Sequence, residues 1–126
     1  IDAKGQYAGS GAEEALPVTL MRSDDRVETP QGIAPRVSEA NHPIVAGLES
    51  VWPDLLGYNR VSAKPGTTLV AQVGDDPLIV AGSIGKGRGV AFTSDCGPHW
   101  APPPFVEWNG YDRLWTQIAD WAAGKI

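Results

Sequence analysis

The side chains best suited to chemistry gather in one short stretch near the C-terminal end of this 126-residue chain. Asp95, Cys96 and His99 lie within residues 93–100, and Glu107 follows a little further on. A histidine transfers protons near neutral pH, a carboxylate fixes its tautomer, and a cysteine becomes a nucleophile once it is ionised. We therefore predict His99, Cys96 and Glu107 as candidate catalytic residues.

The same stretch offers groups that could bind a small molecule. Trp100 and Trp108 can each supply an apolar wall with one N–H donor, and Asp95 adds a carboxylate. Together with the candidate catalytic residues they predict one shared pocket. A purely structural interpretation also fits, because a lone cysteine is often a small buried hydrophobe and tryptophans often only pack.

Two other patterns resemble ligand sites. The spacing Cys96-x-x-His99 offers two metal ligands, but the chain has only one other histidine, so we predict no metal site and no cofactor. Gly85-x-Gly87-x-Gly89 resembles a phosphate-binding loop. No helix follows these glycines, so the amide cradle of such a loop would be missing, and a hairpin turn is the better interpretation.

The composition limits the classes of partner. The net charge of −5 and the scattered basic residues argue against binding to nucleic acid or to an anionic membrane. No apolar run approaches the roughly 20 residues that span a bilayer, and residues 1–10 lack the apolar core of a signal peptide. With a single cysteine, these features favour a cytoplasmic protein with a small-molecule or protein partner.

A β-hairpin is expected to position the candidate site. Residues 77–84 and 89–94 are rich in β-forming residues and are separated by glycines that tolerate a tight turn. The second strand leads directly into residues 93–100. Ligand sites in α/β sheets lie just beyond the carboxyl ends of strands, so this loop is the expected place for one.

The last element is predicted to be a helix over residues 110–123. Its apolar side chains recur at helical spacing: Tyr111, Leu114, Trp115, Ile118, Trp121 and Ala122. Asn109 is the expected N-cap and Gly124 the expected stop.

Shorter elements are predicted before the hairpin. Strands are expected over residues 16–20, 26–29, 55–63 and 68–73, with residues 30–32 closing the second. A single helical turn is expected at Pro43, capped by Asn41. Residues 1–15 read as a loop that leads into a weak helix.

Several motifs resemble the C-terminal half of the class I glutamine amidotransferase-like superfamily. They are His42-Pro43-Ile44-x-x-Gly47-Leu48, Gly85-Lys86-Gly87-Arg88-Gly89, and Asp95-Cys96-x-Pro98-His99-Trp100-Ala101-Pro102-Pro103 followed by Glu107-Trp108. The closest likeness is to its group of putative glutamine amidotransferases, and trehalose-utilisation-type proteins are more weakly similar.

The resemblance implies an α/β, flavodoxin-like three-layer sandwich. The chain looks like its C-terminal part, a mixed sheet with a β-hairpin and a C-terminal helix. Residues 1–126 would then be a single domain that is incomplete at its N-terminal side. We therefore expect an uncovered sheet edge, and either self-association or pairing with the missing N-terminal half.

The resemblance also implies an activity. In the superfamily a cysteine on a strand-to-helix elbow attacks the glutamine amide, a histidine acts as base, and a glutamate two residues later orients it. His99 matches the histidine, the elbow would precede Ile1, and Ala101 stands where the glutamate is expected. Two functions remain open: an amidotransferase-like enzyme, or a non-catalytic ligand-binding or assembly domain with the same fold.

Overall fold

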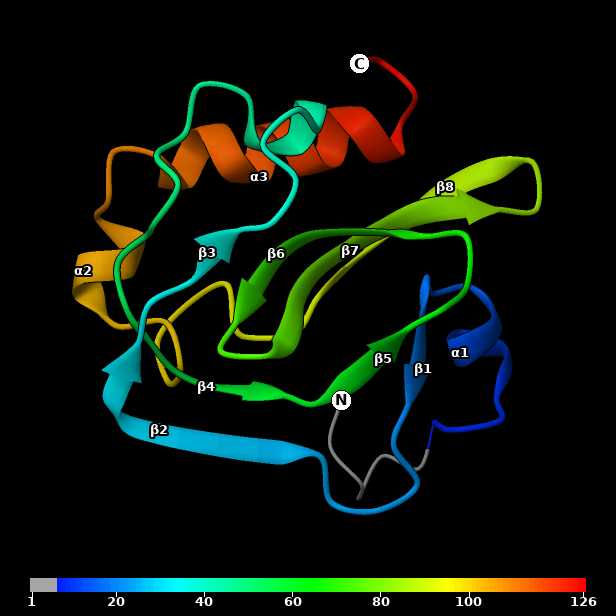
Figure 1. Ribbon diagram of the computed structural model, residues 1–126, viewed down its shortest axis with the longest axis horizontal. Helices are drawn as coiled ribbons and strands as arrows, with labels where there is room; N and C mark the ends of the chain where they lie inside the picture. The colour runs from blue at the N-terminus through cyan, green and yellow to red at the C-terminus, as the bar shows by residue number, and fades with distance from the viewer. Residues whose placement is uncertain (1–6) are drawn as a thin grey trace.

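The fold combines three small antiparallel sheets with few helices. A computed structural model describes residues 7–126, so the first six residues of the predicted N-terminal loop lie outside the described part of the chain (Figure 1). The elements are α1 (Gly11–Glu14), β1 (Val18–Leu20), β2 (Arg26–Ile33), β3 (Arg36–Val37), the 3-10 turn η1 (Pro43–Val45), β4 (Leu55–Asn59), β5 (Val61–Ala63), β6 (Thr68–Val73), β7 (Asp76–Ile84), β8 (Gly87–Phe92), α2 (Pro103–Val106) and α3 (Tyr111–Ala122).

The main sheet has four strands in the order β3-β6-β7-β8. The predicted hairpin is confirmed: β7 and β8 pair antiparallel, with Val80 opposite Ala91. Only Gly85 and Lys86 separate the two strands, and Gly85 adopts a φ of +57° that suits glycine in so short a turn. The predicted strand over residues 68–73 is confirmed as β6.

Strand β7 is buried on both faces. Leu78, Ile79, Val80 and Ala81 are all 0–1% exposed, although consecutive strand residues point to opposite sides of a sheet. Ile79 belongs to the larger core cluster, against which α3 packs, and Val80 belongs to a second cluster with residues of β1 and β5. The main sheet is therefore covered by α3 and η1 on one face and by β1 and β5 on the other (Figure 1).

The predicted C-terminal helix is confirmed as α3. Leu114 is fully buried, Ile118 and Trp121 pack against the core, and the Trp115 ring lies 4.7 Å from that of Phe92. These contacts tie the helix to β8 and to the rest of the core.

The predicted cap of α3 was wrong. Gly110, not Asn109, occupies the N-cap position, and no side chain caps the helix. A Cβ atom at position 110 would lie 2.3 Å from the Trp108 ring, so the tight turn into α3 requires a glycine there. The cap of η1 also differs from the prediction: it is His42 rather than Asn41, since the His42 side chain accepts a hydrogen bond from Ile44 N.

The predicted strand over residues 55–63 is split between two sheets. β4 pairs with β2, and β5 pairs with β1. The break falls at Arg60, whose N–H donates to Asp25 O at 2.7 Å instead of to a ladder partner. β2 extends to Ile33, past the predicted end at Thr29. A register shift in its pairing with β4, between Glu28 and Ile33, accommodates Pro30 and Gly32 within the strand.

The predicted mixed sheet is not observed among residues 7–126, where every strand pairing is antiparallel. The tight turns that join β6 to β7 and β7 to β8 explain this for the main sheet, since parallel neighbours need a crossover of a dozen or more residues. No helix in the described part of the chain is long and apolar enough to cross a membrane.

Candidate functional site

Residues 93–100, the site loop, leave the end of β8 and cross the end of β4. Thr93 N donates to Leu78 O at 3.0 Å, which continues the β7–β8 ladder by one residue. Asn59 N donates to Thr93 O at 2.7 Å, and the Ser94 hydroxyl donates to Gly57 O at 2.6 Å. The loop is therefore anchored at its start by strands from two sheets.

An Asp–His pair occupies the far end of this loop. Asp95 Oδ2 lies 3.2 Å from His99 Nδ1 and also accepts a hydrogen bond from Trp100 N at 3.1 Å. The His99 side chain is 70% exposed. The carboxylate is thus fixed by the backbone, while the rest of the imidazole ring faces solvent.

The backbone at His99 is strained. Its φ is +111°, and it is the only non-glycine residue with positive φ among residues 7–126. Such a conformation is costly for a residue with a Cβ atom and persists only where surrounding contacts enforce it. Strain of this kind is concentrated at functional sites.

Trp100 is the anchor beneath the pair. The side chain is only 6% exposed, and its ring stacks on that of His99 with centroids 5.3 Å apart. The indole N–H donates to Glu28 Oε2 at 3.1 Å. Since Gly57 lies opposite Glu28 in the β2–β4 ladder and has no side chain, the indole can lie directly on β4.

A polar hollow of about 300 Å³ opens beside these groups. Its lining comes from three segments of the chain: Arg26 and Glu28 of β2, Asn59 of β4, and Asp95, His99 and Trp100 of the site loop. It therefore presents a guanidinium, two carboxylates, an amide and an imidazole to one space. Arg26 also forms an ion pair with Asp24 at 2.8 Å.

Of the six predicted site residues, Asp95, His99 and Trp100 line the polar hollow. Cys96, Glu107 and Trp108 do not line the polar hollow. Cys96 is exposed, Glu107 ends α2, and Trp108 packs on Trp52 and donates to Glu49 Oε2. Their assignments as catalytic or binding residues stay predictions.

The surroundings of Cys96 differ from a nucleophile elbow. Its carbonyl accepts a hydrogen bond from the Tyr111 hydroxyl, and the next helix, α2, begins only at Pro103. Burial raises the pKa of Tyr111, and the neighbouring Cys96 adds to the increase. The hydrogen bond from Tyr111 therefore ties the loop around Cys96 to α3.

Arg26, Glu28 and Asn59 were missed by sequence analysis. Arg26 and Glu28 share one face of a strand, which was a local signal that charge gathers there. The pairing of Arg26 with Asn59 joins residues far apart in sequence, and nothing local specifies it. In the described part of the chain, no three His, Cys, Asp or Glu side chains are grouped so as to hold a metal ion.

Two solved structures share this architecture, whereas no curated protein matches the chain. Two solved structures from Salmonella typhimurium superimpose with a TM-score of 0.91: cytoplasmic protein STM3548 at 36% identity and, from strain LT2, cytoplasmic protein STM1381 at 39% identity. The matches cover 96% and 97% of this chain but 49% of each relative, so the chain spans about half their length.

A family model gives the assignment. The model described as "Putative glutamine amidotransferase" matches residues 1–124, nearly the whole chain. The His-Trp motif of the site loop and the Gly-Lys-Gly-Arg turn of the β7–β8 hairpin both lie inside this match. The chain therefore belongs to the family of glutamine amidotransferase-like proteins.

Proposed function

We propose that this chain supplies the acid–base pair of a site that processes a small amide-bearing substrate, with His99 as the proton carrier and Asp95 as its partner. The proposal depends on one observation above all: the Asp95 carboxylate bonds one ring nitrogen of His99 while the ring is 70% exposed beside a polar hollow.

The pair can act as a general base. With Asp95 accepting from Nδ1–H, the lone pair of the neutral ring resides on Nε2, the nitrogen that Asp95 does not bind. Nε2 would take the proton of the attacking nucleophile and then return it to the leaving ammonia. Asp95 would stabilise the transient imidazolium, and the bond from Trp100 N keeps that carboxylate in place.

The charges of the polar hollow favour a zwitterionic substrate. Arg26 can attract a carboxylate, while Glu28 and Asp95 can attract an ammonium group. Asn59 adds an amide that can both donate and accept hydrogen bonds. An amino acid with a side-chain carboxamide, such as L-glutamine, matches this set and agrees with the family.

We infer the wider context from the same comparisons. The superfamily resemblance implies that the chain forms the C-terminal part of a flavodoxin-like three-layer domain, and two relatives about twice as long leave room for the other part. Their description as cytoplasmic proteins supports a cytoplasmic location for this one. Within such a domain the nucleophile would come from the part that corresponds to the unmatched half of the relatives. Cys96 does not lie on a strand-to-helix elbow, because the next helix begins only at Pro103.

A second candidate function is ligand binding without catalysis. Ala101 stands where the superfamily resemblance implies an orienting glutamate, and it is fully buried. If Asp95 does not replace that glutamate in function, the site would bind the same zwitterion without turning it over.

Titration with L-glutamine, followed by backbone and indole N–H signals in NMR, tests the binding step. We expect shifts at Glu28, Asn59, Asp95, His99 and the Trp100 indole. Asp95→Asn should weaken the binding, while Asp75→Asn, at an exposed position away from the hollow, should not. Shifts elsewhere, or none up to about 10 mM, which is ten times the upper end of common KM values, would contradict the proposal.

A further inference from the structure

Asp25 is a buried carboxylate directly before β2. The residue is only 3% exposed, and no ion pair in the described part of the chain involves it. A charge taken out of water is costly unless hydrogen bonds replace the solvation that it loses. Asp25 therefore depends on the few groups that donate to it.

Asp25 holds Asn59 by two neighbouring contacts. Its Oδ1 accepts a hydrogen bond from Asn59 Nδ2 at 3.1 Å, and its carbonyl oxygen accepts one from Arg60 N at 2.7 Å. From the site loop, Thr93 O accepts a hydrogen bond from Asn59 N at 2.7 Å. The backbone of Asn59 and the nitrogen end of its side chain are thus both anchored.

The chemistry of this contact decides which way the Asn59 amide turns. A carboxylate only accepts hydrogen bonds, whereas a carboxamide has a donating nitrogen and an accepting oxygen. Turning the amide over would set its oxygen against the Asp25 carboxylate and leave a buried charge without its donor. The nitrogen therefore faces Asp25, and Asn59 Oδ1 faces away from it.

Asn59 Oδ1 is available to a ligand. No described residue donates to it. Among the partly or fully buried residues of 7–126, Trp115 Nε1 is the only polar side-chain atom that is sealed from solvent and without a partner. The Asn59 oxygen is therefore open to solvent. Because Asn59 lines the polar hollow together with Asp95 and His99, the hollow presents a neutral acceptor alongside the proposed acid–base pair.

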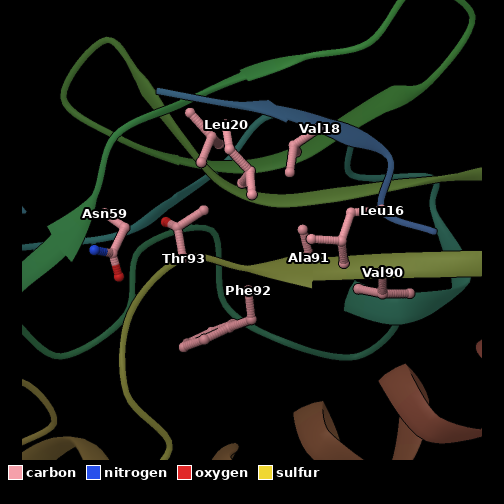
Figure 2. A pocket seen from close by; sticks show the side chains of 9 residues that line it. Leu16, Val18, Leu20, Asn59, Val90, Ala91, Phe92 and Thr93 are labelled. Atoms are coloured by element: carbon pink, nitrogen blue, oxygen red, sulfur yellow. The ribbon is translucent and has the colours of Figure 1, made fainter. Parts of the chain in front are cut away.

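Asn59 also lines a second hollow of about 220 Å³, which is apolar (Figure 2). Asn59 lies at one end of it, and most of the other lining side chains are aliphatic or aromatic. Thr93 is the other polar lining residue, and its hydroxyl donates to Pro77 O at 2.9 Å. A polar ligand group finds little to bond on that side, so it would meet Asn59 from the polar hollow.

We propose that Asn59 determines the specificity of the polar hollow and that Asp25 is its positioning residue. The buried carboxylate holds the amide so that Asn59 Oδ1 accepts a hydrogen bond from a carboxamide N–H of the substrate. Glu28 and Asp95 supply charged oxygens that suit an ammonium group, which leaves the neutral oxygen for the neutral amide. This inference deepens the proposed function and rests on it.

Two ligands of equal charge test the proposal: L-glutamine and the γ-methyl ester of L-glutamate. They share the amino-acid zwitterion, but the ester has no side-chain N–H to donate. In NMR titrations of the parent chain, L-glutamine should bind about tenfold more tightly, the effect of one hydrogen bond of roughly 1.4 kcal/mol. If L-glutamine does not bind, the proposed function and this inference both fall. If the ester binds as tightly as L-glutamine, only this inference falls.

Substitutions assign the preference to the two residues. Asn59→Leu removes the acceptor with little change in side-chain size, so the preference for L-glutamine should disappear. Asp25→Leu removes the group that orients Asn59, and the preference should fall although Asp25 contacts no ligand. Asp25→Asn is measured beside it because it keeps the shape of the buried side chain. An amide at position 25 can face Asn59 with either its oxygen or its nitrogen, so the preference should fall here too. A parent-like preference in Asn59→Leu or in Asp25→Asn would overturn the proposal.

Asp75→Leu is the matched control for the change of charge. Asp75 is exposed and does not line the polar hollow, so this variant should keep the preference of the parent chain. An equal loss in Asp75→Leu and Asp25→Leu would mean that net charge, and not the orientation of Asn59, sets the preference. That result would overturn the role of Asp25.

Discussion

The Trp100 indole lies so close to Gly57 that a Cβ atom at position 57 would fall 2.3 Å from indole Nε1. Real Cβ atoms do not approach other atoms so closely, and Trp100 is held there by its bond to Glu28. The absence of a side chain on β4 is therefore what allows Trp100, and the His99 ring stacked on it, to occupy their places.

Gly57→Ala is expected to displace Trp100 and destabilise the protein. Forcing one extra carbon into a packed site costs about 1–3 kcal/mol. Urea unfolding should show this loss of stability, and the indole N–H signal of Trp100 should move in NMR because its bond to Glu28 is disturbed.

Gly97→Ala in the same loop provides the control. A Cβ atom there would meet nothing within 4 Å, and Gly97 has no positive φ, so the change should stay within about 0.5 kcal/mol. If both alanines had the same effect, the contact between Gly57 and Trp100 would not explain the loss.

Tyr58 is expected to make the protein less stable at high pH. Its hydroxyl donates to Asp76 Oδ2 at 2.6 Å, and burial together with that carboxylate raises its pKa from 10 to about 12. The folded state thus holds the phenol proton more tightly than the unfolded state. The resulting stabilisation is complete below pH 10 and is lost as the pH rises through 12, with a magnitude on the order of 2 kcal/mol.

Tyr58→Phe isolates this effect. Denaturant unfolding of both proteins between about pH 9 and pH 12 should show a steeper loss for the parent chain than for the variant. Parallel curves would mean that Tyr58 does not titrate as proposed.

His42 is expected to act in the opposite pH range. Its Nδ1 accepts the bond from Ile44 N that caps η1, and burial lowers its pKa below 6.5. The folded state therefore prefers the neutral ring. Its contribution to stability is present above pH 6.5 and is lost as the pH falls through the lowered pKa.

His42→Asn keeps a capping acceptor but does not titrate. Urea midpoints at about pH 8 and pH 5 should therefore fall less in the variant than in the parent chain. An undiminished fall in the variant would assign the acid sensitivity to another group.

Local patterns in the sequence were sufficient for the hairpin, for β6 and for α3. β6, β7 and β8 pair with their neighbours along the chain, so alternation within each strand was enough to find them. The helical spacing of α3 marked its buried residue Leu114, although the core against which it packs comes from distant segments. Tertiary contacts decided the remaining details. The backbone of Asp25 takes the N–H of Arg60 out of the ladder, and Trp108 makes Gly110 the N-cap.

The candidate site was predictable only in part for the same reason. Asp95, His99 and Trp100 are neighbours in sequence and are found together in the structure. Glu28 reaches Trp100 only because β2 pairs with β4, and no spacing rule links residues so far apart. Proximity in sequence did not bring Glu107 or Trp108 to the polar hollow, because α2 carries the chain away from it.

The tautomer of His99 tests the central claim most directly. The bond from His99 Nδ1 to Asp95 Oδ2 requires the proton of the neutral ring to reside on Nδ1, leaving Nε2 as the base. Imidazole ¹⁵N chemical shifts of the neutral ring should therefore show a protonated Nδ1 and an unprotonated Nε2. In Asp95→Asn this preference should be lost. A neutral ring with its proton on Nε2 in the parent chain, or a ring unchanged by Asp95→Asn, would contradict the account.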